Sequence, residues 1–147
     1  MSNEHITVLL HETVDSLNVN PDGIYVDMTL GRGGHSSLVL SKLSDKGVLI
    51  GIDQDEEAIS KTKARLDKFG KKNHLFKTNF VNFDKCLSEL EIKEVDGFIF
   101  DLGVSSPQFD EADRGFSYRM DARLDMRMDR SQELDAYKVV NSYSLKD

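Results

Sequence analysis

The sequence predicts an α/β protein built on a mostly parallel sheet, and two features carry this prediction. Short apolar runs alternate with segments of helical spacing along roughly the first hundred residues. Continuous apolar strands separated by helices are typical of a sheet that is covered on both faces and connected by right-handed crossovers. The length of 147 residues allows one domain of ordinary size with its own core, rather than two.

The expected elements follow one another as β, α, β, α, β, α and β. Strands are expected where β-branched and apolar residues run together, at 23–30, 46–53, 73–80 and 94–103. Helices are expected between these strands, at 35–43, 54–69 and 81–90. The middle helix has acids in its first turn and bases in its last turn, which complements the helix dipole.

The last third of the chain follows a different pattern. Residues 102–130 show no helical period, and within them residues 119–129 alternate strictly between charged and apolar side chains. A helix would stack like charges four residues apart, whereas an extended segment sets opposite charges two residues apart on one face. We therefore expect an extended or looped segment, followed by a helix at 131–145 that begins with Ser131 as its N-cap.

Composition argues against several classes of protein. No apolar run approaches the roughly 18 residues of a membrane span, and the N-terminus has no export signal, so we expect no membrane partner and a cytoplasmic location. A single cysteine, Cys86, excludes an internal disulfide and a cysteine-cluster metal site, and we expect no metal. The net charge of −7 argues against nucleic-acid binding by bulk attraction. The lysines of 61–72 could form a local basic patch, although a solvated helix face is the favoured interpretation.

A glycine loop follows the first expected strand and contains Gly31, Gly33 and Gly34. Glycines permit left-handed backbone and let a ligand approach the main chain closely. Ligands of parallel sheets bind at the carboxyl ends of the strands, which is where this loop is expected. A phosphate-binding P-loop is excluded because no Gly-Lys-Ser/Thr follows, and a dinucleotide G-x-G-x-x-G pattern is incomplete because its sixth position is Ser36.

Two further signals lie after the second and fourth strands. Asp53 ends the second strand, where its carboxylate could accept hydrogen bonds from a ribose diol or could instead cap the following helix. A ribose contact would suit a nicotinamide cofactor and S-adenosylmethionine equally. The sequence Ser-Pro-Gln-Phe at 106–109 resembles the Asp/Asn/Ser-Pro-Pro-Tyr/Phe loop of methyltransferases that act on exocyclic amino nitrogens, except that Gln108 replaces a proline. Such a turn offers acceptors to a base NH2 while the aromatic ring stacks on the base; the alternative is a turn with a buried phenylalanine.

Taken together, four segments resemble the bacterial ribosomal small-subunit RNA cytosine-N4 methyltransferase family. They read HITVLLHETVDSLNV, GIYVDMTLGRGGHS, IGIDQD and DGFIFDLGVSSPQFDEADRGFSYRMDARLDMRMD, and they cover the chain from Ile6 to Asp129. The resemblance implies a Rossmann-like S-adenosylmethionine-dependent methyltransferase fold. It also implies methylation of N4 of one cytidine in the decoding region of 16S rRNA in the small ribosomal subunit.

Carried over residue by residue, the resemblance implies a set of cofactor contacts. These are Gly33, Gly34, His35, Asp53, Phe80, Asp101 and Gln108. No catalytic residue is assigned. Asp101 or a loop carbonyl is a candidate acceptor for the proton that N4 releases, and the target cytosine has to be unstacked or single-stranded for its nitrogen to be reached.

The chain departs from the family in length, because family members are about twice as long and carry a helical insertion. The resemblance implies a sheet truncated after the fourth strand, with a partial cofactor domain at 1–130 and the start of the insertion at 131–147. An unpaired edge on the fourth strand could pair with a second copy, which makes a homodimer a candidate assembly. Two alternatives stay open, a non-catalytic fragment that binds S-adenosylmethionine and a nicotinamide-dependent oxidoreductase.

Overall fold

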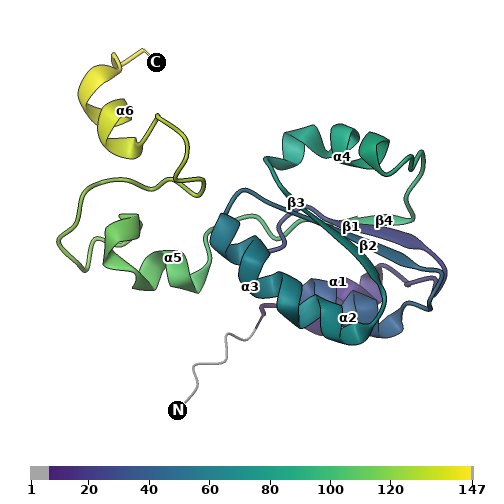
Figure 1. Cartoon of the computed structure of the whole chain (residues 1–147). Helices are drawn as coiled ribbons and strands as arrows, with labels where there is room; N and C mark the ends of the chain where they lie inside the picture. The colour runs from purple at the N-terminus through teal and green to yellow at the C-terminus, as the bar shows by residue number, and fades with distance from the viewer. Residues whose placement is uncertain (1–6, 147) are drawn as a thin grey trace. The chain divides into compact units, whose positions relative to one another are not determined.

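The computed structural model describes residues 7–146, and the chain divides into two compact units after Leu102 (Figure 1). The first contains a sheet with helices, and the second contains short helices joined by long loops. The division falls earlier than the boundary expected near residue 130, and the assignment of 131–147 to a helical insertion stays a prediction.

The first unit is built on a four-stranded, all-parallel sheet in the order β3-β2-β1-β4, which confirms the predicted α/β fold. The strands are β1 (Ile24–Asp27), β2 (Val48–Asp53), β3 (Lys72–Lys77) and β4 (Gly97–Ile99). The chain runs outward from β1 through β2 to β3 and then returns to the other side of β1. The strand order therefore reverses between β1 and β4, and the strands end before the polar residues that the predicted ranges included.

Four helices pack on this sheet. They are α1 (Leu10–Ser16), α2 (Gly34–Lys42), α3 (Glu56–Leu66) and α4 (Phe83–Glu89), with single 3-10 turns at Asp67–Phe69 and Phe80–Asn82. Three of them confirm the predicted helices, whereas α1 was not predicted. Figure 1 shows α1, α2 and α3 on one face of the sheet and α4 on the other. Among residues 7–146, no helix is both long enough and apolar enough to cross a membrane.

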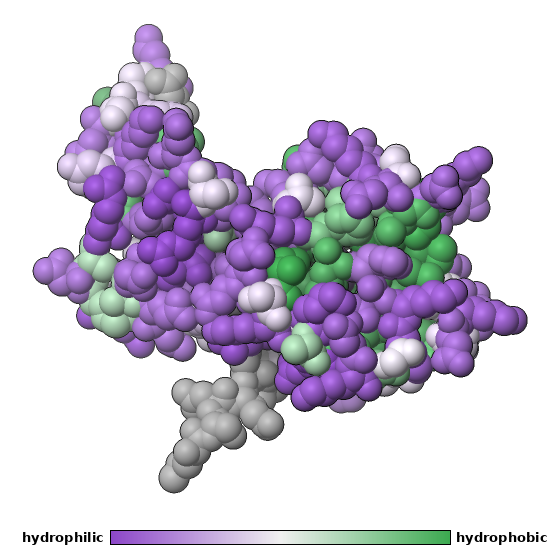
Figure 2. All heavy atoms as spheres, in the orientation of Figure 1, coloured by the Kyte–Doolittle hydropathy of each residue, from purple (hydrophilic) through white to green (hydrophobic). Residues whose placement is uncertain are grey.

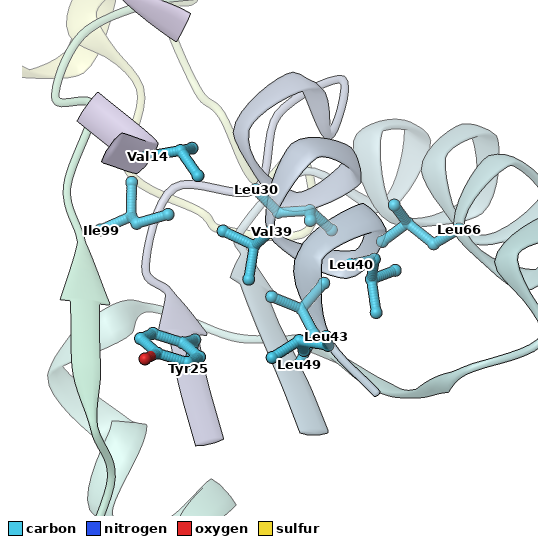
Figure 3. Close-up of a cluster of buried hydrophobic side chains, with 9 residues drawn as sticks. All are labelled: Val14, Tyr25, Leu30, Val39, Leu40, Leu43, Leu49, Leu66 and Ile99. Carbon is cyan, nitrogen blue, oxygen red and sulfur yellow. The ribbon is translucent and has the colours of Figure 1, made fainter. Parts of the chain in front are cut away.

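The alternation of strand side chains divides the apolar residues between two cores. The core under α1, α2 and α3 is drawn in Figure 3 and consists of Val14, Tyr25, Leu30, Val39, Leu40, Leu43, Leu49, Leu66 and Ile99. The core under α4 consists of Val26, Met28, Ile50, Ile52 and Cys86, with half-buried aromatic residues around it. Both faces are covered as predicted, but α4 leaves Phe98 and Phe100 partly exposed. Figure 2 shows hydrophobic surface gathered beside α4.

The second unit contains α5 (Ser106–Asp110), a 3-10 turn at Ala112–Arg114 and α6 (Ala136–Ser142). Residues 121–127 have no regular structure, which agrees with the predicted loop, but α5 shows that the expectation of no helix before residue 130 was wrong. The predicted N-cap was also wrong. Asp135 caps α6 by accepting a hydrogen bond from the Lys138 N–H at 2.8 Å, whereas Ser131 donates to Asp129 instead.

Charged side chains, rather than apolar ones, form the interior of this second unit. Arg114 is buried and donates to the carbonyl oxygens of Arg127 and Met128, at 3.3 and 3.2 Å. Arg127 in turn forms a two-pronged ion pair with Asp125, which confirms that opposite charges two residues apart meet. Of the two predicted conformations, extended or looped, the loop is observed, because Met126 lies between these two residues with a left-handed φ of 59° and is exposed.

Candidate functional site

The candidate site lies at the carboxyl end of the sheet, around the loop that leaves β1. Backbone hydrogen bonds tie this loop to both neighbouring strands, from Met28 N–H to Ile99 O at 2.9 Å and from Leu30 N–H to Ile52 O at 3.0 Å. The Asp101 N–H donates to the hydroxyl of Thr29 at 2.7 Å. The loop is therefore fixed where the strand order reverses, which is the usual position for a ligand crevice in such sheets.

The three glycines of the loop have different surroundings. Gly33 has a φ of 70°, and an added Cβ there would collide with the methyl group of Thr62 on α3. An added Cβ at Gly34 would collide with the side chain of Thr7. Beside Gly31, with a φ of 48°, the nearest atom to an added Cβ would be 3.7 Å away. The protein's own packing thus explains Gly33 and Gly34, whereas space for a close ligand remains beside Gly31.

Asp53 lies at the end of β2, and backbone donors hold its carboxylate in place. One oxygen accepts from the Gly31 N–H at 2.8 Å and the other from the Asp55 N–H at 2.9 Å. The alternative role as helix cap is wrong, because Asp55 is the residue that caps α3. Burial raises the pKa of Asp53 above its usual range. A carboxylate has about four acceptor sites, and the backbone donors of Gly31, Gln54 and Asp55 leave part of this capacity for a ribose hydroxyl.

Asp27 is a site residue that the sequence-based reasoning did not assign. It ends β1, is buried, and accepts hydrogen bonds from the Ser36 hydroxyl at 2.7 Å and the Thr29 N–H at 3.1 Å. Burial raises the pKa of Asp27, with a partial opposing effect from the Ser36 hydrogen bond. The signal that could have identified it is an acid at the end of an apolar strand, immediately before a glycine loop. Its bonds join β1 to the first turn of α2.

His35 and Asp101 are brought together between β1 and β4. The Nδ1 atom of His35 lies 3.9 Å from a carboxylate oxygen of Asp101. His35 is only 5% exposed, and its Nε2 atom has no hydrogen-bond partner within residues 7–146. The side chain of Asp101 is 56% exposed, so this carboxylate can be reached from outside. A buried ring nitrogen without a partner is costly, and a bound polar group would relieve that cost.

The last two predicted contacts have structural roles of their own. Phe80 follows β3, packs against the core under α4 and meets the ring of Phe100 edge to face at 6.0 Å between centroids. Gln108 lies in the second unit, where its side chain is buried and accepts from the Ser105 N–H at 2.9 Å to cap α5. Phe109 is 47% exposed, so the alternative of a turn with a buried phenylalanine is wrong. Cofactor contact by Phe80 and Gln108 stays a prediction.

Comparison with known proteins identifies the family. The model of the MraW methylase family matches residues 2–147. The chain belongs to this family. Ribosomal RNA small subunit methyltransferase H of Clostridium botulinum (strain Kyoto / Type A2) is 59% identical over 143 residues, which are 97% of this chain and 46% of that protein. The protein of the same name from Fusobacterium nucleatum is 56% identical over 140 residues, or 95% of this chain and 45% of that protein.

A solved structure supports the fold assignment. A Clostridium thermocellum crystal structure, described as that of a candidate rRNA-methylase, superposes with a TM-score of 0.58 at 26% identity. The match covers 68% of this chain and 54% of that one. The resemblance noted in the sequence and the Rossmann-like methyltransferase fold are thereby confirmed. The chain spans about half the length of the curated relatives it matches.

The lysines at 61–72 do not form a free basic patch on this MraW methylase family member. Lys61 pairs with Glu57, and Lys63 pairs with Asp67 at 2.8 Å. The ammonium of Lys71 donates to carbonyl oxygens at the end of α2, including that of Leu40 at 2.9 Å. These contacts favour the interpretation as a solvated helix face, because three of the five lysines already have partners, and the other two, Lys68 and Lys72, are exposed.

The residues at this site fit a methyl donor of the adenosyl type. Asp53 presents a fixed acceptor, space remains beside Gly31, and the Nε2 atom of His35 lacks a partner in the described part of the chain. The first turn of α2 adds free backbone N–H groups, which suit a carboxylate. Acceptors for a diol and donors for an amino-acid carboxylate are what S-adenosylmethionine requires at its two ends.

Proposed function

We propose that this chain is the cofactor-binding part of an S-adenosylmethionine-dependent methyltransferase that acts on small-subunit ribosomal RNA. The observation that carries the proposal is the fixed carboxylate of Asp53 beside the space at Gly31, in a member of the MraW methylase family. The names of the relatives support RNA as the substrate class. Since the substrate would be ribosomal RNA, the proposed location is the cytoplasm.

The finer proposal is methyl transfer to the exocyclic N4 of a cytidine in the decoding region of 16S rRNA. Its support is the sequence resemblance, including the loop at 106–109. In this proposal Asp53 binds the ribose, Phe80 lies against the adenine, and Gly33, Gly34 and His35 bind the methionyl end. Asp101 and Gln108 complete the set of cofactor contacts.

In this reaction the main contribution of the protein is to position the two reactants. When bound, S-adenosylmethionine supplies a methyl group on a sulfonium, ready for in-line transfer. A conjugated amine is a weak nucleophile, and correct orientation of two reactants can lower a barrier by about 7 to 11 kcal/mol. The partly exposed carboxylate of Asp101, close to His35, is the proposed acceptor for the proton that N4 loses. No strong base is needed, because the alkylated nitrogen is acidic.

The cofactor part of the proposal is tested by calorimetric titration with S-adenosylhomocysteine and, separately, with NADH. Binding of S-adenosylhomocysteine alone is expected. Asp53→Ala should weaken it by about 1 to 3 kcal/mol, the usual cost of leaving hydrogen-bonding groups without partners. Asp45→Ala, at an exposed acid in the turn before β2, is the matched control. Binding of NADH alone would support the oxidoreductase alternative and would refute this proposal.

A second candidate is a cofactor-binding chain without turnover, favoured because the matched relatives are about twice as long. Incubation of unmethylated small ribosomal subunits with radiolabelled S-adenosylmethionine distinguishes the two. Transfer of one methyl group per subunit supports the enzyme. Binding of the cofactor without transfer supports the non-catalytic alternative.

We also propose that this chain can self-associate as a homodimer through β4. This strand lies at the end of the sheet, and in the described part of the chain no other strand pairs with its outer edge. Exposed edges favour strand pairing between chains. Sedimentation equilibrium should show a dimer, and Phe98→Pro, which removes a backbone donor from β4, should reduce it. A monomer at all concentrations would refute the dimer.

A further inference from the structure

The loop at 115–123 in the second unit is closed at its base by close backbone contacts. Gly115 has a φ of 70°, and an added Cβ there would collide with the backbone at Arg123 and Asp125. Just outside the loop, the Met126 N–H donates to the carbonyl oxygen of Arg114 at 3.0 Å. Compact surface loops whose ends meet in this way are frequently functional.

Buried polar contacts hold the base of this loop in one conformation. Arg114, only 3% exposed, bonds two carbonyl oxygens of the following segment. Arg123 pairs with Asp135 at 2.8 Å and lies over the ring of Tyr137 at 4.5 Å. Because both ends of the loop are held, the exposed tip projects from a fixed base.

The tip of the loop, residues 118–121, presents an aromatic ring and a cation to solvent. Tyr118 is 95% exposed, so both faces of its ring are open. Arg119 and Met120 are also exposed, and so is Asp121. An aromatic ring that packs on nothing in its own unit gains no stability from its apolar surface. Its position on a fixed base is explained if the ring meets another molecule.

The arginines of the second unit separate into two groups. Arg123, Arg127 and Arg130 each pair with an aspartate, and Arg114 bonds backbone carbonyls. The side chain of Arg119 makes no ion pair or hydrogen bond with any residue in 7–146. The first group therefore holds the unit together, and Arg119 is left to interact with a ligand. Its neighbour Asp121 keeps the tip nearly neutral overall.

We propose that the tip at 118–121 binds single-stranded RNA, with Tyr118 stacked on an unpaired base and Arg119 on a phosphate. The inference rests on the proposed function, which makes RNA the substrate class. Stacking on aromatic rings needs base faces that a duplex hides, so single strands are favoured. Because Asp121 offsets one charge, stacking by Tyr118 supplies more of the binding than attraction to the phosphate does.

The test is fluorescence anisotropy of this chain with a labelled single-stranded RNA of twelve nucleotides at low salt. Tyr118→Ala is expected to bind about 5- to 150-fold more weakly, the range found for loss of one stacked base. Tyr143→Ala, at another exposed tyrosine of the same unit, is the matched control and should bind like the unchanged protein. Tyr118→Phe keeps the ring and should retain binding.

Two further measurements separate charge from stacking. Arg119→Gln is expected to weaken binding by less than tenfold and to lower the slope of log affinity against log salt by about 0.7, the value for one phosphate of a single strand. A duplex of the same sequence should compete poorly. Equal competition by the duplex would overturn the proposal.

The outcomes also distinguish this inference from the function on which it rests. If S-adenosylhomocysteine binds and the RNA does not, or if Tyr118→Ala binds RNA as tightly as the unchanged protein, the tip proposal is overturned and the cofactor proposal stands. If RNA binding depends on Tyr118 while S-adenosylhomocysteine does not bind, the cofactor proposal fails and the tip proposal stands. The Tyr118→Phe result shows whether loss of binding reflects the ring or a misfolded unit.

Discussion

The two units of this chain are held together by different forces. Every buried hydrophobic side chain among residues 7–146 lies in the first unit, in the two layers around the sheet. In the second unit, the buried side chains in this described range are Gln108, Arg114, Asp125 and Asp135, all of them polar. Apolar burial tolerates small movements, whereas buried ion pairs require specific partners and geometry.

This difference leads to different expectations for stability. The first unit gains free energy from apolar area removed from water, which accumulates over many contacts. The second unit depends on a few charged groups, and loss of one partner leaves the other buried without compensation. We expect the second unit to open at lower cost, and each substitution below should act mainly on its own unit.

The largest effect is expected for Gly33→Val in the first unit. The new side chain would collide with Thr62 and would hold a branched residue at a positive φ. Overpacking costs about 1 to 3 kcal/mol and left-handed strain about 1 to 2, so unfolding free energy should fall by about 2 to 5 kcal/mol. Urea denaturation measures this. Gly31→Ala, where space is open, should cost only about 1 to 2 kcal/mol. Adding Thr62→Ser to Gly33→Val should recover part of the loss, because serine lacks the colliding methyl group and keeps the hydroxyl that donates to the Gly31 carbonyl oxygen.

In the second unit, Arg114→Met is expected to increase local opening while the first unit stays intact. Two carbonyl oxygens would lose a charged donor. A hydrogen bond to a charged group contributes about 1.5 to 3 kcal/mol, so the free energy of local opening should fall by about this amount. Trypsin cleavage after Arg123 and Arg127 should therefore become about 10- to 100-fold faster. Arg130→Gln, which removes the exposed pair with Asp113, is the control and should change the rate by less than about fivefold. Equal rates for both variants would contradict a structural role for Arg114.

Acidification is expected to affect the two units in opposite directions. Hydrogen bonds from Arg127 lower the pKa of Asp125 to about 2, and Arg123 lowers the pKa of Asp135. Both carboxylates therefore stabilise the second unit above pH 4, and this stabilisation is lost as the pH falls toward 2. For Asp125 the lost free energy is about 1 to 2 kcal/mol after allowance for solvent screening. NMR signals of α6 should weaken in this range, and Asp125→Asn should weaken them already at neutral pH.

For the first unit the sign is reversed. Burial raises the pKa of Asp27 and of Asp53, so the folded state binds protons more readily than the unfolded chain. Lowering the pH from 7 toward 4 should therefore add stability from these two groups, which stops once both are protonated in the unfolded chain too. Signals of β1 should persist at a pH where those of α6 are lost. If the signals of β1 and of α6 were lost at the same pH, the expected difference between the two units would be refuted.

The smallest effect is expected for Phe100→Ala. The ring of Phe100 meets Phe80 edge to face, and such pairs contribute about 0.5 to 1.5 kcal/mol. If Phe80 lies against adenine, S-adenosylhomocysteine should bind about 2- to 12-fold more weakly by calorimetry. Phe98→Ala is the comparison variant and should weaken binding less, because Phe98 meets Phe83 edge to face and reaches Phe80 only through Phe100, whose ring centroid lies 6.5 Å away. Equal affinities for both variants would show that Phe100 does not support the site.

The sequence predicted the first unit well because apolar spacing reports burial directly. Each expected strand and helix was found, and only α1 was missed. The position of Asp53 at the end of β2 could be predicted because the apolar run stops there, and its contact with a cofactor stays a prediction. Asp27 could not, because burial of an acid depends on the Ser36 hydroxyl that reaches it from α2. The side chains that pack against Gly33 and Gly34 are those of Thr62 and Thr7. Both come from segments distant in sequence, so no local pattern predicts these contacts.

In the second unit, local patterns were less informative because partners lie far apart in sequence. Asp135, rather than Ser131, caps α6, and it is also the partner of Arg123. Alternation of charge and apolar residues at 119–129 identified a non-helical segment correctly. The alternation could not show that Asp125 would be buried while Met126 stayed exposed. That outcome depends on the ion pair of Asp125 with Arg127 and on the left-handed backbone of Met126.

The contact between Gly33 and Thr62 has an evolutionary consequence. Only a smaller residue at position 62 makes room for a side chain at position 33, so the order of two mutations matters in any lineage. A change of Thr62 to serine first removes the methyl group and keeps the hydroxyl that donates to the Gly31 carbonyl oxygen at 2.8 Å, whereas a change at 33 first creates the collision and is removed by selection. Reconstructed ancestors of this family should therefore never combine a bulky residue at 33 with threonine at 62.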